Sequence, residues 1–267
     1  SQKKILDHAD FDIWKTIKNT TISPDGDYIM YSLEKGEKDN FLKIKDPKGK
    51  TIFSYNRALK GTFSYDSKFA FFSIKPWKDS ITELKRKKVK KNKLPKDSLG
   101  IYDIKSKSLT KIGNIKSYKT PFKWSGFVAY QYESTAKEQK SKKKDSKTSK
   151  KKTKKVSAKN GYHLVLVNLA TKKQDTFKFV TQYTFAEKGK FLAFSSTGKT
   201  LKENSSVHVY DLNNDKLSEI YQSKKAKYYQ LNFSESGKNL AFVVDTDTTK
   251  TQRRPNKLYH WSNGTNA

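Results

Sequence analysis

The feature that most constrains the fold is a tight turn followed by an alternating strand, which recurs five times along the chain. The first copy is Ser-Pro-Asp-Gly at residues 23–26, followed directly by aromatic and aliphatic residues at 28–31. Gly or Ser at the end of the turn permits the left-handed backbone that a short hairpin needs, and Pro24 presets φ at the start of the turn. The other four copies begin at Ser64, Lys123, Ala186 and Ser234.

Each copy has a second half, in which an apolar strand ends in a polar residue and enters another turn. One more short strand follows in most copies, as at 51–55 and 216–221. Four antiparallel strands that recur every ~40–50 residues are typical of propeller blades. The alternative is a generic β-sandwich. In that fold, the five copies of the turn and strand, each with its second half, would have to occur in order by coincidence. The strands of the second half lie at 41–46, 99–104, 164–169, 207–212 and 258–261.

The sequence therefore predicts an all-β fold, a β-propeller of four-stranded antiparallel blades with about five blades visible and the ring incomplete. An incomplete ring leaves a blade edge unpaired, which favours aggregation. We therefore expect the chain to be a fragment of a longer protein or to be completed by another chain. The expected divisions are an N-terminal segment at 1–17 and a partial propeller at 18–267, with blades at approximately 18–58, 59–115, 116–180, 181–223 and 224–267, the last incomplete.

Two Lys-rich insertions, 85–96 and 136–157, explain the uneven spacing of the copies. Both fall between the second and third strands of a blade, so we expect both loops on one rim. The second insertion holds eleven Lys and almost nothing apolar, so burial cannot offset its ordering entropy and we expect disorder. Two interpretations stay open: a tether for a polyanion or a membrane, and solvated insertions that loops tolerate. We favour the second.

The net charge of +31, from 57 basic and 26 acidic residues, raises the question of a nucleic-acid partner. Proteins that recognise bases depend on the bidentate Arg fork, and almost all basic residues here are Lys. A Lys-biased proteome explains the charge better, so no specific nucleic-acid partner is predicted. Loose attraction to polyanions or to an anionic membrane face stays open. The four arginines are Arg57, Arg86, Arg253 and Arg254.

Composition excludes several kinds of chemistry. The chain has no Cys, which excludes thiol catalysis, disulfides and Cys-ligated metal sites, and leaves the compartment open. No apolar run approaches the ~18–20 residues that span a bilayer, so no transmembrane segment is predicted.

The blade repeat resembles that of the prolyl oligopeptidase (S9) family and of TolB-type propellers. Two stretches narrow the resemblance. Residues 8–17 (His-Ala-Asp-Phe-Asp-Ile-Trp-Lys-Thr-Ile) look like the N-terminus of S9-type serine peptidases of Bacteroidetes bacteria, and residues 93–103 look like the second-blade insertion of that group. The resemblance spans essentially the whole chain, although many propellers share the repeat itself. It implies an N-terminal propeller of about seven or eight blades and a C-terminal α/β-hydrolase domain that carries Ser, Asp and His.

The chain itself shows no catalytic constellation. No Gly-x-Ser-x-Gly pentapeptide, the elbow that exposes a nucleophilic Ser, is present. The four histidines, His8, His163, His208 and His260, do not cluster with carboxylates at the spacing of metal ligands. We expect the last three in or beside the third strand of a blade, packed or at an edge. No catalytic, cofactor-binding or metal residue is therefore predicted, no cofactor is expected, and the substrate-binding residues stay unassigned.

These observations, with the resemblance, lead to one favoured function and two alternatives. The favoured one is a non-catalytic propeller that gates or docks peptide substrates for a C-terminal α/β-hydrolase domain, on the same or a separate chain. The first alternative is a stand-alone TolB-like interaction propeller in the cell envelope. The second is a polyanion-binding module that uses the Lys-rich loops. In relatives this N-terminal segment usually comes directly after a signal peptide, so the resemblance implies a periplasmic or secreted protein.

Overall fold

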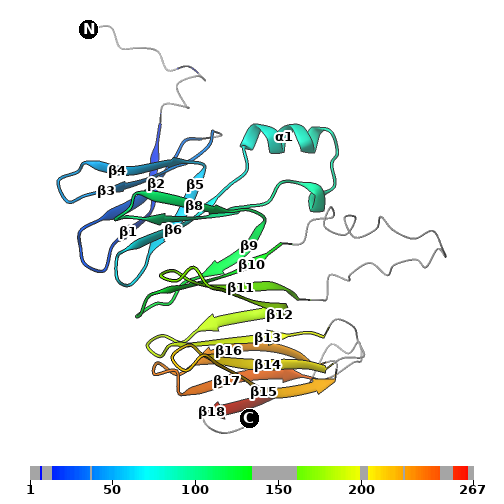
Figure 1. The fold of residues 1–267 in the computed structure, drawn as a ribbon. Helices are drawn as coiled ribbons and strands as arrows, with labels where there is room; N and C mark the ends of the chain where they lie inside the picture. The colour runs from blue at the N-terminus through cyan, green and yellow to red at the C-terminus, as the bar shows by residue number, and fades with distance from the viewer. Residues whose placement is uncertain are drawn as a thin grey trace, which may run out of the picture. The chain divides into compact units, whose positions relative to one another are not determined.

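The computed structural model describes residues 7, 14–36, 38–133, 161–198, 204–224, 226–246 and 255–263. In this part of the chain, 18 strands, one α-helix and one short 3-10 helix are present (Figure 1), and neighbouring strands within β1–β8 and β10–β18 pair in antiparallel fashion. The predicted all-β class is confirmed. Of the N-terminal segment 1–17, residues 1–6 and 8–13 lie outside the described residues. The whole of the 136–157 insertion lies outside them too, so the expectation of disorder in that insertion stays a prediction.

The chain divides into two compact units, and the first extends to Lys116. It contains two four-stranded sheets, blades one and two, whose strands are hydrogen-bonded in chain order. Blade one consists of β1 (Thr16–Ile22), β2 (Ile29–Glu34), β3 (Phe41–Lys45) and β4 (Thr51–Asn56). Blade two consists of β5 (Ala58–Phe63), β6 (Phe69–Ile74), β7 (Ser98–Asp103) and β8 (Ser108–Ile112).

The second unit contains a seven-stranded sheet, β9 to β15, and a three-stranded sheet, β16 to β18. The seven-stranded sheet is two blades that share one long strand, β12 (Gln174–Phe185). The first part of β12 pairs with β11, and the part from Val180 onward pairs with β13. The remaining strands are β9 (Ile115–Lys119), β10 (Phe127–Tyr132), β11 (Tyr162–Asn168), β13 (Phe191–Ser196), β14 (Asn204–Asp211), β15 (Lys216–Lys224), β16 (Lys227–Phe233), β17 (Asn239–Asp245) and β18 (Asn256–Ser262).

A left-handed residue marks the crossing from one blade to the next. Arg57 (φ 64°) separates β4 from β5, and Phe179 (φ 58°) lies where β12 changes partner. Both carbonyls accept a similar backbone hydrogen bond, Arg57 from Lys75 at 2.9 Å and Phe179 from Thr197 at 2.8 Å. The crossing is thus a repeated structure even where the sequence offers no glycine for the strained backbone.

The repeated turn is held by the hydroxyl of its first residue. The Oγ of Ser23 accepts the N–H of Tyr28 at 2.9 Å, and the Oγ of Ser64 accepts that of Phe69 at 2.9 Å. Serine is favoured there because its side chain satisfies a backbone donor that the turn leaves unpaired. The positive φ predicted at the last turn residue is present at Gly26, Ser67, Gly126 and Gly237.

Gly189 is the exception, because it lies outside the left-handed region. A Cβ at Gly189 would stand 2.4 Å from the carbonyl oxygen of Ser236, which belongs to the equivalent turn of the next blade. Glycine is therefore required at this turn by the close approach of two backbones.

The second repeated turn follows the third strand of each blade. The Asp46 carboxylate accepts the N–H of Lys50 at 2.8 Å, and the Asp103 carboxylate that of Ser106 at 3.0 Å. Asn168 and Asp211 make the same kind of bond to residues two and three positions on. These side-chain bonds to the backbone of the turn explain why Asp or Asn stands at or just after the end of the third strand in four blades.

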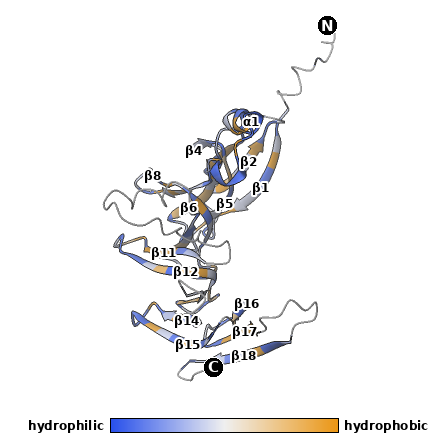
Figure 2. Ribbon diagram, turned by 90° about the vertical axis from the view of Figure 1, so that its right-hand side faces the viewer, coloured by the Kyte–Doolittle hydropathy of each residue, from blue (hydrophilic) through white to orange (hydrophobic). Residues whose placement is uncertain are grey.

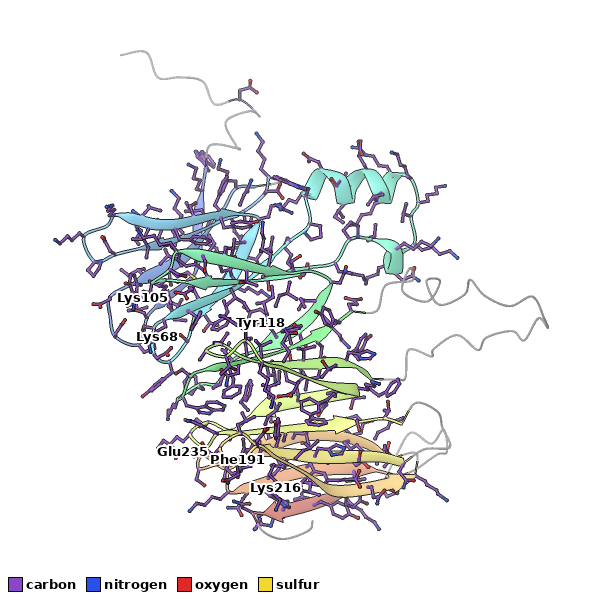
Figure 3. The ribbon with its side chains drawn as sticks, viewed as in Figure 1. Lys68, Lys105, Tyr118, Phe191, Lys216 and Glu235 are labelled. Carbon is purple, nitrogen blue, oxygen red and sulfur yellow. The ribbon has the colours of Figure 1, made fainter. Side chains whose placement is uncertain are left out.

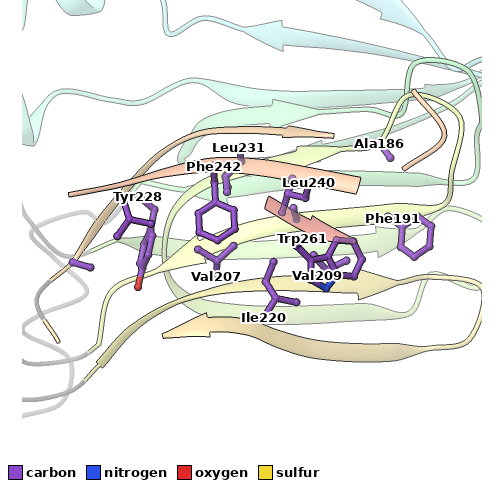
Figure 4. Packing of buried hydrophobic residues seen from close by; sticks show 13 residues of the cluster. Ala186, Phe191, Val207, Val209, Ile220, Tyr228, Leu231, Leu240, Phe242 and Trp261 are labelled. Atoms are coloured by element: carbon purple, nitrogen blue, oxygen red, sulfur yellow. The ribbon is translucent and has the colours of Figure 1, made fainter. Parts of the chain in front are cut away.

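The core consists of buried side chains between successive blades of each unit. Hydrophobic segments alternate with hydrophilic ones along the strands (Figure 2), which is the pattern of strands with one face in a core. In the first unit, Met30 and Leu42 of blade one pack with Ala70 and Phe72 of blade two. In the second unit, blade four packs on blade five (Figure 4), and the cluster comprises Ala186, Phe191, Ala193, Val207, Val209, Ile220, Ala226, Tyr228, Leu231, Leu240, Phe242, Val244 and Trp261.

The turns of blades three, four and five are also joined by charge. Lys123 forms ion pairs with Glu187 and, at 3.6 Å, with Glu235, and Lys188 pairs with Glu235 at 2.6 Å. Figure 3 labels Glu235 beside Phe191, the first residue of β13. The pairs are exposed, so each contributes little to stability by itself, but together they connect three successive blades at their turns.

The second blade carries an insertion that is partly helical. Helix α1 (Lys78–Arg86) and the short η2 (Lys91–Lys93) occupy the segment between β6 and β7. The sequence predicts a Lys-rich loop at 85–96. In the structure the first two residues of that range, Lys85 and Arg86, are instead the last two residues of α1. Asp79 in the first turn of the helix, and Lys85 with Arg86 in the last, match the helix dipole. This charge distribution favours a helix in so polar a segment.

Candidate functional site

The described histidines lie on the third strand of successive blades, as the sequence predicts. His163 is on β11, His208 on β14 and His260 on β18. His163 and His260 are exposed, and His208 is half-buried. His8 lies outside the described residues.

The surroundings of His208 contain the components of a catalytic triad but not its geometry. Nε2 of His208 lies 2.8 Å from Oγ of Ser206, and Oε2 of Glu219 lies 3.9 Å from the same nitrogen. A triad requires the carboxylate on the other ring nitrogen, and Nδ1 of His208 is buried without a partner. Ser206 is buried and shares its hydroxyl with Ser196 at 3.0 Å. The group is therefore a packing arrangement.

Burial favours the neutral form of the His208 imidazole. Desolvation lowers the pKa of His208, and the nearby Glu219 carboxylate opposes that shift only in part. The ring stacks on Phe194, with centroids 4.9 Å apart and an interplanar angle of 20°. A neutral imidazole suits such stacking, because a charged ring in an apolar contact would lose its hydration.

Within the described ranges, no three His, Asp or Glu side chains gather as metal ligands would. The same ranges contain no helix with the length and apolar character to cross a membrane.

Two cavities lie beside the start of α1, both in the first unit. The first has a volume of about 290 Å³ and is lined by residues of the β2–β3 loop, by Asn56 and by the first helical residues. Nζ of Lys78 donates to the carbonyl oxygens of Gly36 and Lys38, so the helix is fixed to that loop. The N–H of Lys78 also donates to Oδ1 of Asp39 at 3.3 Å. Oδ1 of Asn56 is buried there without a hydrogen-bond partner.

The second cavity has a volume of about 350 Å³ and lies on the β4–β5 junction side of the helix. Arg57 and Trp77 form its most distinctive contact, with the guanidinium carbon 4.2 Å from the ring centroid. Sequence reasoning left the substrate-binding residues unassigned and missed both cavities. The available signal was Arg57, one of only four arginines in a Lys-rich chain, together with the Pro76-Trp77 pair at the start of the insertion.

Comparison with known proteins gives a fold but no sequence family. No protein family matches the sequence, and no curated protein matches it. Solved structures do match. The β-propeller domain of the Trilobed protease from Pyrococcus furiosus has a TM-score of 0.51 at 13% identity, covering 94% of this chain and 69% of that chain. A prolyl endopeptidase structure has a TM-score of 0.53 at 12% identity, covering 96% of this chain and 36% of that one.

A third match is to a eukaryotic initiation factor, with a TM-score of 0.51 at 12% identity, covering 95% of this chain and 54% of that chain. At such identities the likeness concerns the fold. The chain is a β-propeller of four-stranded antiparallel blades, similar in fold to propeller domains of peptidases of the prolyl endopeptidase kind. It spans about a third of the length of the prolyl endopeptidase that it matches.

Proposed function

We propose that this chain is the non-catalytic propeller of a serine peptidase of the prolyl oligopeptidase family, of the type found in Bacteroidetes bacteria. The observation that carries the proposal is the match to a prolyl endopeptidase over 96% of the chain. The N-terminal segment at 8–17 and the stretch at 93–103 support it by their resemblance to that group. The partner is a C-terminal α/β-hydrolase domain, on the same or a separate chain, and the substrate is a peptide.

The propeller's contribution is exclusion and docking. Blades packed face to face through buried apolar side chains form a rigid frame. An opening bounded by such a frame admits an extended peptide and rejects a folded protein. Bond cleavage follows the Ser-His-Asp acyl-transfer scheme in the hydrolase domain, so residues 1–267 take no part in the chemical step.

Periplasmic or secreted localisation belongs to the same proposal. It depends on the resemblance of the N-terminal segment to a segment that usually comes after a signal peptide in other proteins. Fractionation of the source cells tests it: the protein is expected in the periplasm or the medium, and recovery with cytoplasmic markers would contradict it.

The test of function is active-site labelling of the native gene product with a fluorophosphonate, which reacts with an activated serine. We expect the native protein to be labelled and to hydrolyse peptide substrates, and we expect residues 1–267 alone to be inert in both assays. A native protein that takes no label would overturn the peptidase function.

A second candidate is a stand-alone TolB-like interaction propeller that acts as a scaffold in the cell envelope. We keep it because the match to an initiation factor indicates that this fold is not confined to peptidases. Under this alternative the native gene product takes no fluorophosphonate label and instead co-purifies with envelope proteins. The labelling experiment therefore separates the two candidates directly.

A further inference from the structure

The second cavity is organised around Arg57, which lies at the crossing from blade one to blade two. Its N–H donates to the carbonyl oxygen of Asn40 at 2.5 Å, and its carbonyl oxygen accepts the N–H of Lys75 at 2.9 Å. Nη1 then donates to the carbonyl oxygen of Lys75 at 2.9 Å. Backbone and side chain are thus both fixed, and the guanidinium lies over the Trp77 ring. In this position the flat face of the guanidinium contacts the ring, and its N–H groups point outward in the guanidinium plane.

Most donors of this guanidinium have no acceptor among the described residues of the protein. A guanidinium has five N–H groups, and one of them binds the carbonyl of Lys75. Nε is buried without a hydrogen-bond partner, and among the described residues no carboxylate pairs with Arg57. Nε is too deeply buried to be reached, so an acceptor that enters the cavity would bind the Nη donors that the Lys75 carbonyl does not use, and it would gain a charge-assisted hydrogen bond.

The rest of the cavity has the same sign of charge. Four lining residues are basic and none is acidic; the basic ones are Arg57, Lys75, Lys96 and Lys111. Lys75 is neutralised by Asp97 at 2.5 Å. Lys111 donates to the Tyr55 hydroxyl at 3.2 Å and lies over that ring at 5.5 Å, and it has no carboxylate partner in the described part of the chain. Arg57 and Lys111 therefore bring positive charge to the cavity without a carboxylate partner in the described part of the chain.

The walls between these cations are apolar. Ile74, Pro76 and Pro95 line the cavity with the rings of Tyr55 and Trp77. Trp77 is 49% exposed, so part of its surface is available for contact. A cavity of about 350 Å³ accommodates a small ligand, and apolar walls with a few convergent polar groups are the usual composition of such sites.

We propose that this cavity is a binding site for an oxyanion, a carboxylate or a phosphate, carried on an apolar or aromatic group. The Arg57 guanidinium takes the oxyanion, Lys111 adds a second positive charge, and Trp77 with the two prolines covers the apolar part. The site is formed wholly within the first unit, so its test does not require the proposed hydrolase domain.

The experiment titrates the full chain with three probes at physiological ionic strength, which screens the general attraction of a +31 chain for anions. The probes are phenylacetate, phenyl phosphate and the neutral phenylacetamide. Binding is followed by backbone amide NMR shifts. We expect both anions to shift the amides of residues 75, 77–80 and 96–98, and phenylacetamide to bind at least about tenfold more weakly. The anion that binds more tightly identifies the natural ligand. Tighter binding of phenylacetate indicates an acidic side chain or C-terminal carboxylate of a peptide, and tighter binding of phenyl phosphate indicates a phosphate ester.

Variants test the assignment of residues. Arg57→Gln is expected to weaken both anions at least about tenfold, and Lys111→Gln to weaken them by a smaller factor. The matched control is Lys107→Gln, another exposed lysine of the β7–β8 hairpin that does not line the cavity; its binding stays unchanged. If Arg57→Gln fails to fold, the amide shifts of the native chain and the affinities of Lys111→Gln decide whether the anions bind in this cavity. Equal affinity for acid and amide, or shifts outside the cavity, would overturn the proposal.

Discussion

The indole Nε1 of Trp124 donates a hydrogen bond to the carbonyl oxygen of Ala186 at 3.0 Å, which joins the turn of blade three to the turn of blade four. Trp124 is buried, and its ring meets the Phe185 ring edge-on at 5.4 Å. The N–H of neighbouring Lys123 donates in parallel to the carbonyl oxygen of Glu187 at 3.1 Å. Adjacent blades are therefore coupled at their turns by direct hydrogen bonds as well as by the apolar core.

Replacing Trp124 by Phe tests this coupling. The variant keeps an aromatic ring but removes the donor to a buried carbonyl, so we expect a loss of about 1–3 kcal/mol in the free energy of unfolding, measured by urea denaturation. Tyr65 holds the equivalent position in the turn of blade two and is 50% exposed. Tyr65→Phe is the matched control and is expected to change stability by less than about 0.5 kcal/mol. Equal losses in the two variants would contradict the coupling.

Gly100 provides a test of blade packing. A Cβ at Gly100 would lie 2.3 Å from Cε2 of Phe72, whose ring is fully buried. The ring has no room to retreat, so Gly100→Ala is expected to cost about 1–3 kcal/mol by overpacking. At Gly113 the added Cβ meets only Oγ of Ser98, at 3.9 Å. Gly113→Ala should therefore leave the urea midpoint nearly unchanged, and a similar shift in both variants would count against this account of the first unit.

The sequence predicts the parts of this fold that local chemistry determines. The Ser and Gly positions of the repeated turn and the Asx turns after the third strands follow from residue types a few positions apart. The reason for Gly189 does not, because it depends on the backbone of Ser236 in another blade. The same holds for the cavity at Arg57, whose partner Trp77 is twenty residues away and is placed by the insertion. Neither contact leaves a periodic pattern that sequence reasoning can detect.

The pH dependence of stability should identify His208. Burial lowers its pKa in the folded state, so below the ordinary value of about 6.5 the unfolded chain binds a proton that the folded chain does not. Stability is therefore lost as pH falls below about 6.5, by at most about 1.4 kcal/mol per pH unit from this group. The loss continues down to the lowered pKa of the folded state.

Denaturation of the native chain and of His208→Gln at several pH values above and below about 6.5 measures this contribution. The native chain should lose more stability on acidification than the variant does. His260→Gln is the control, because the His260 side chain is exposed, and it should keep the native dependence. If His208→Gln keeps it as well, the buried imidazole is not its source.

The central claim is that this propeller serves a larger peptidase, and the most direct measurement is the intact mass of the gene product from its source organism. The chain has a mass of 30.8 kDa and spans 36% of the prolyl endopeptidase that it matches. The account predicts a native mass about two to three times larger, enough for further blades and a hydrolase domain. A native mass of about 31 kDa would contradict it and would leave a propeller that is closed by another chain.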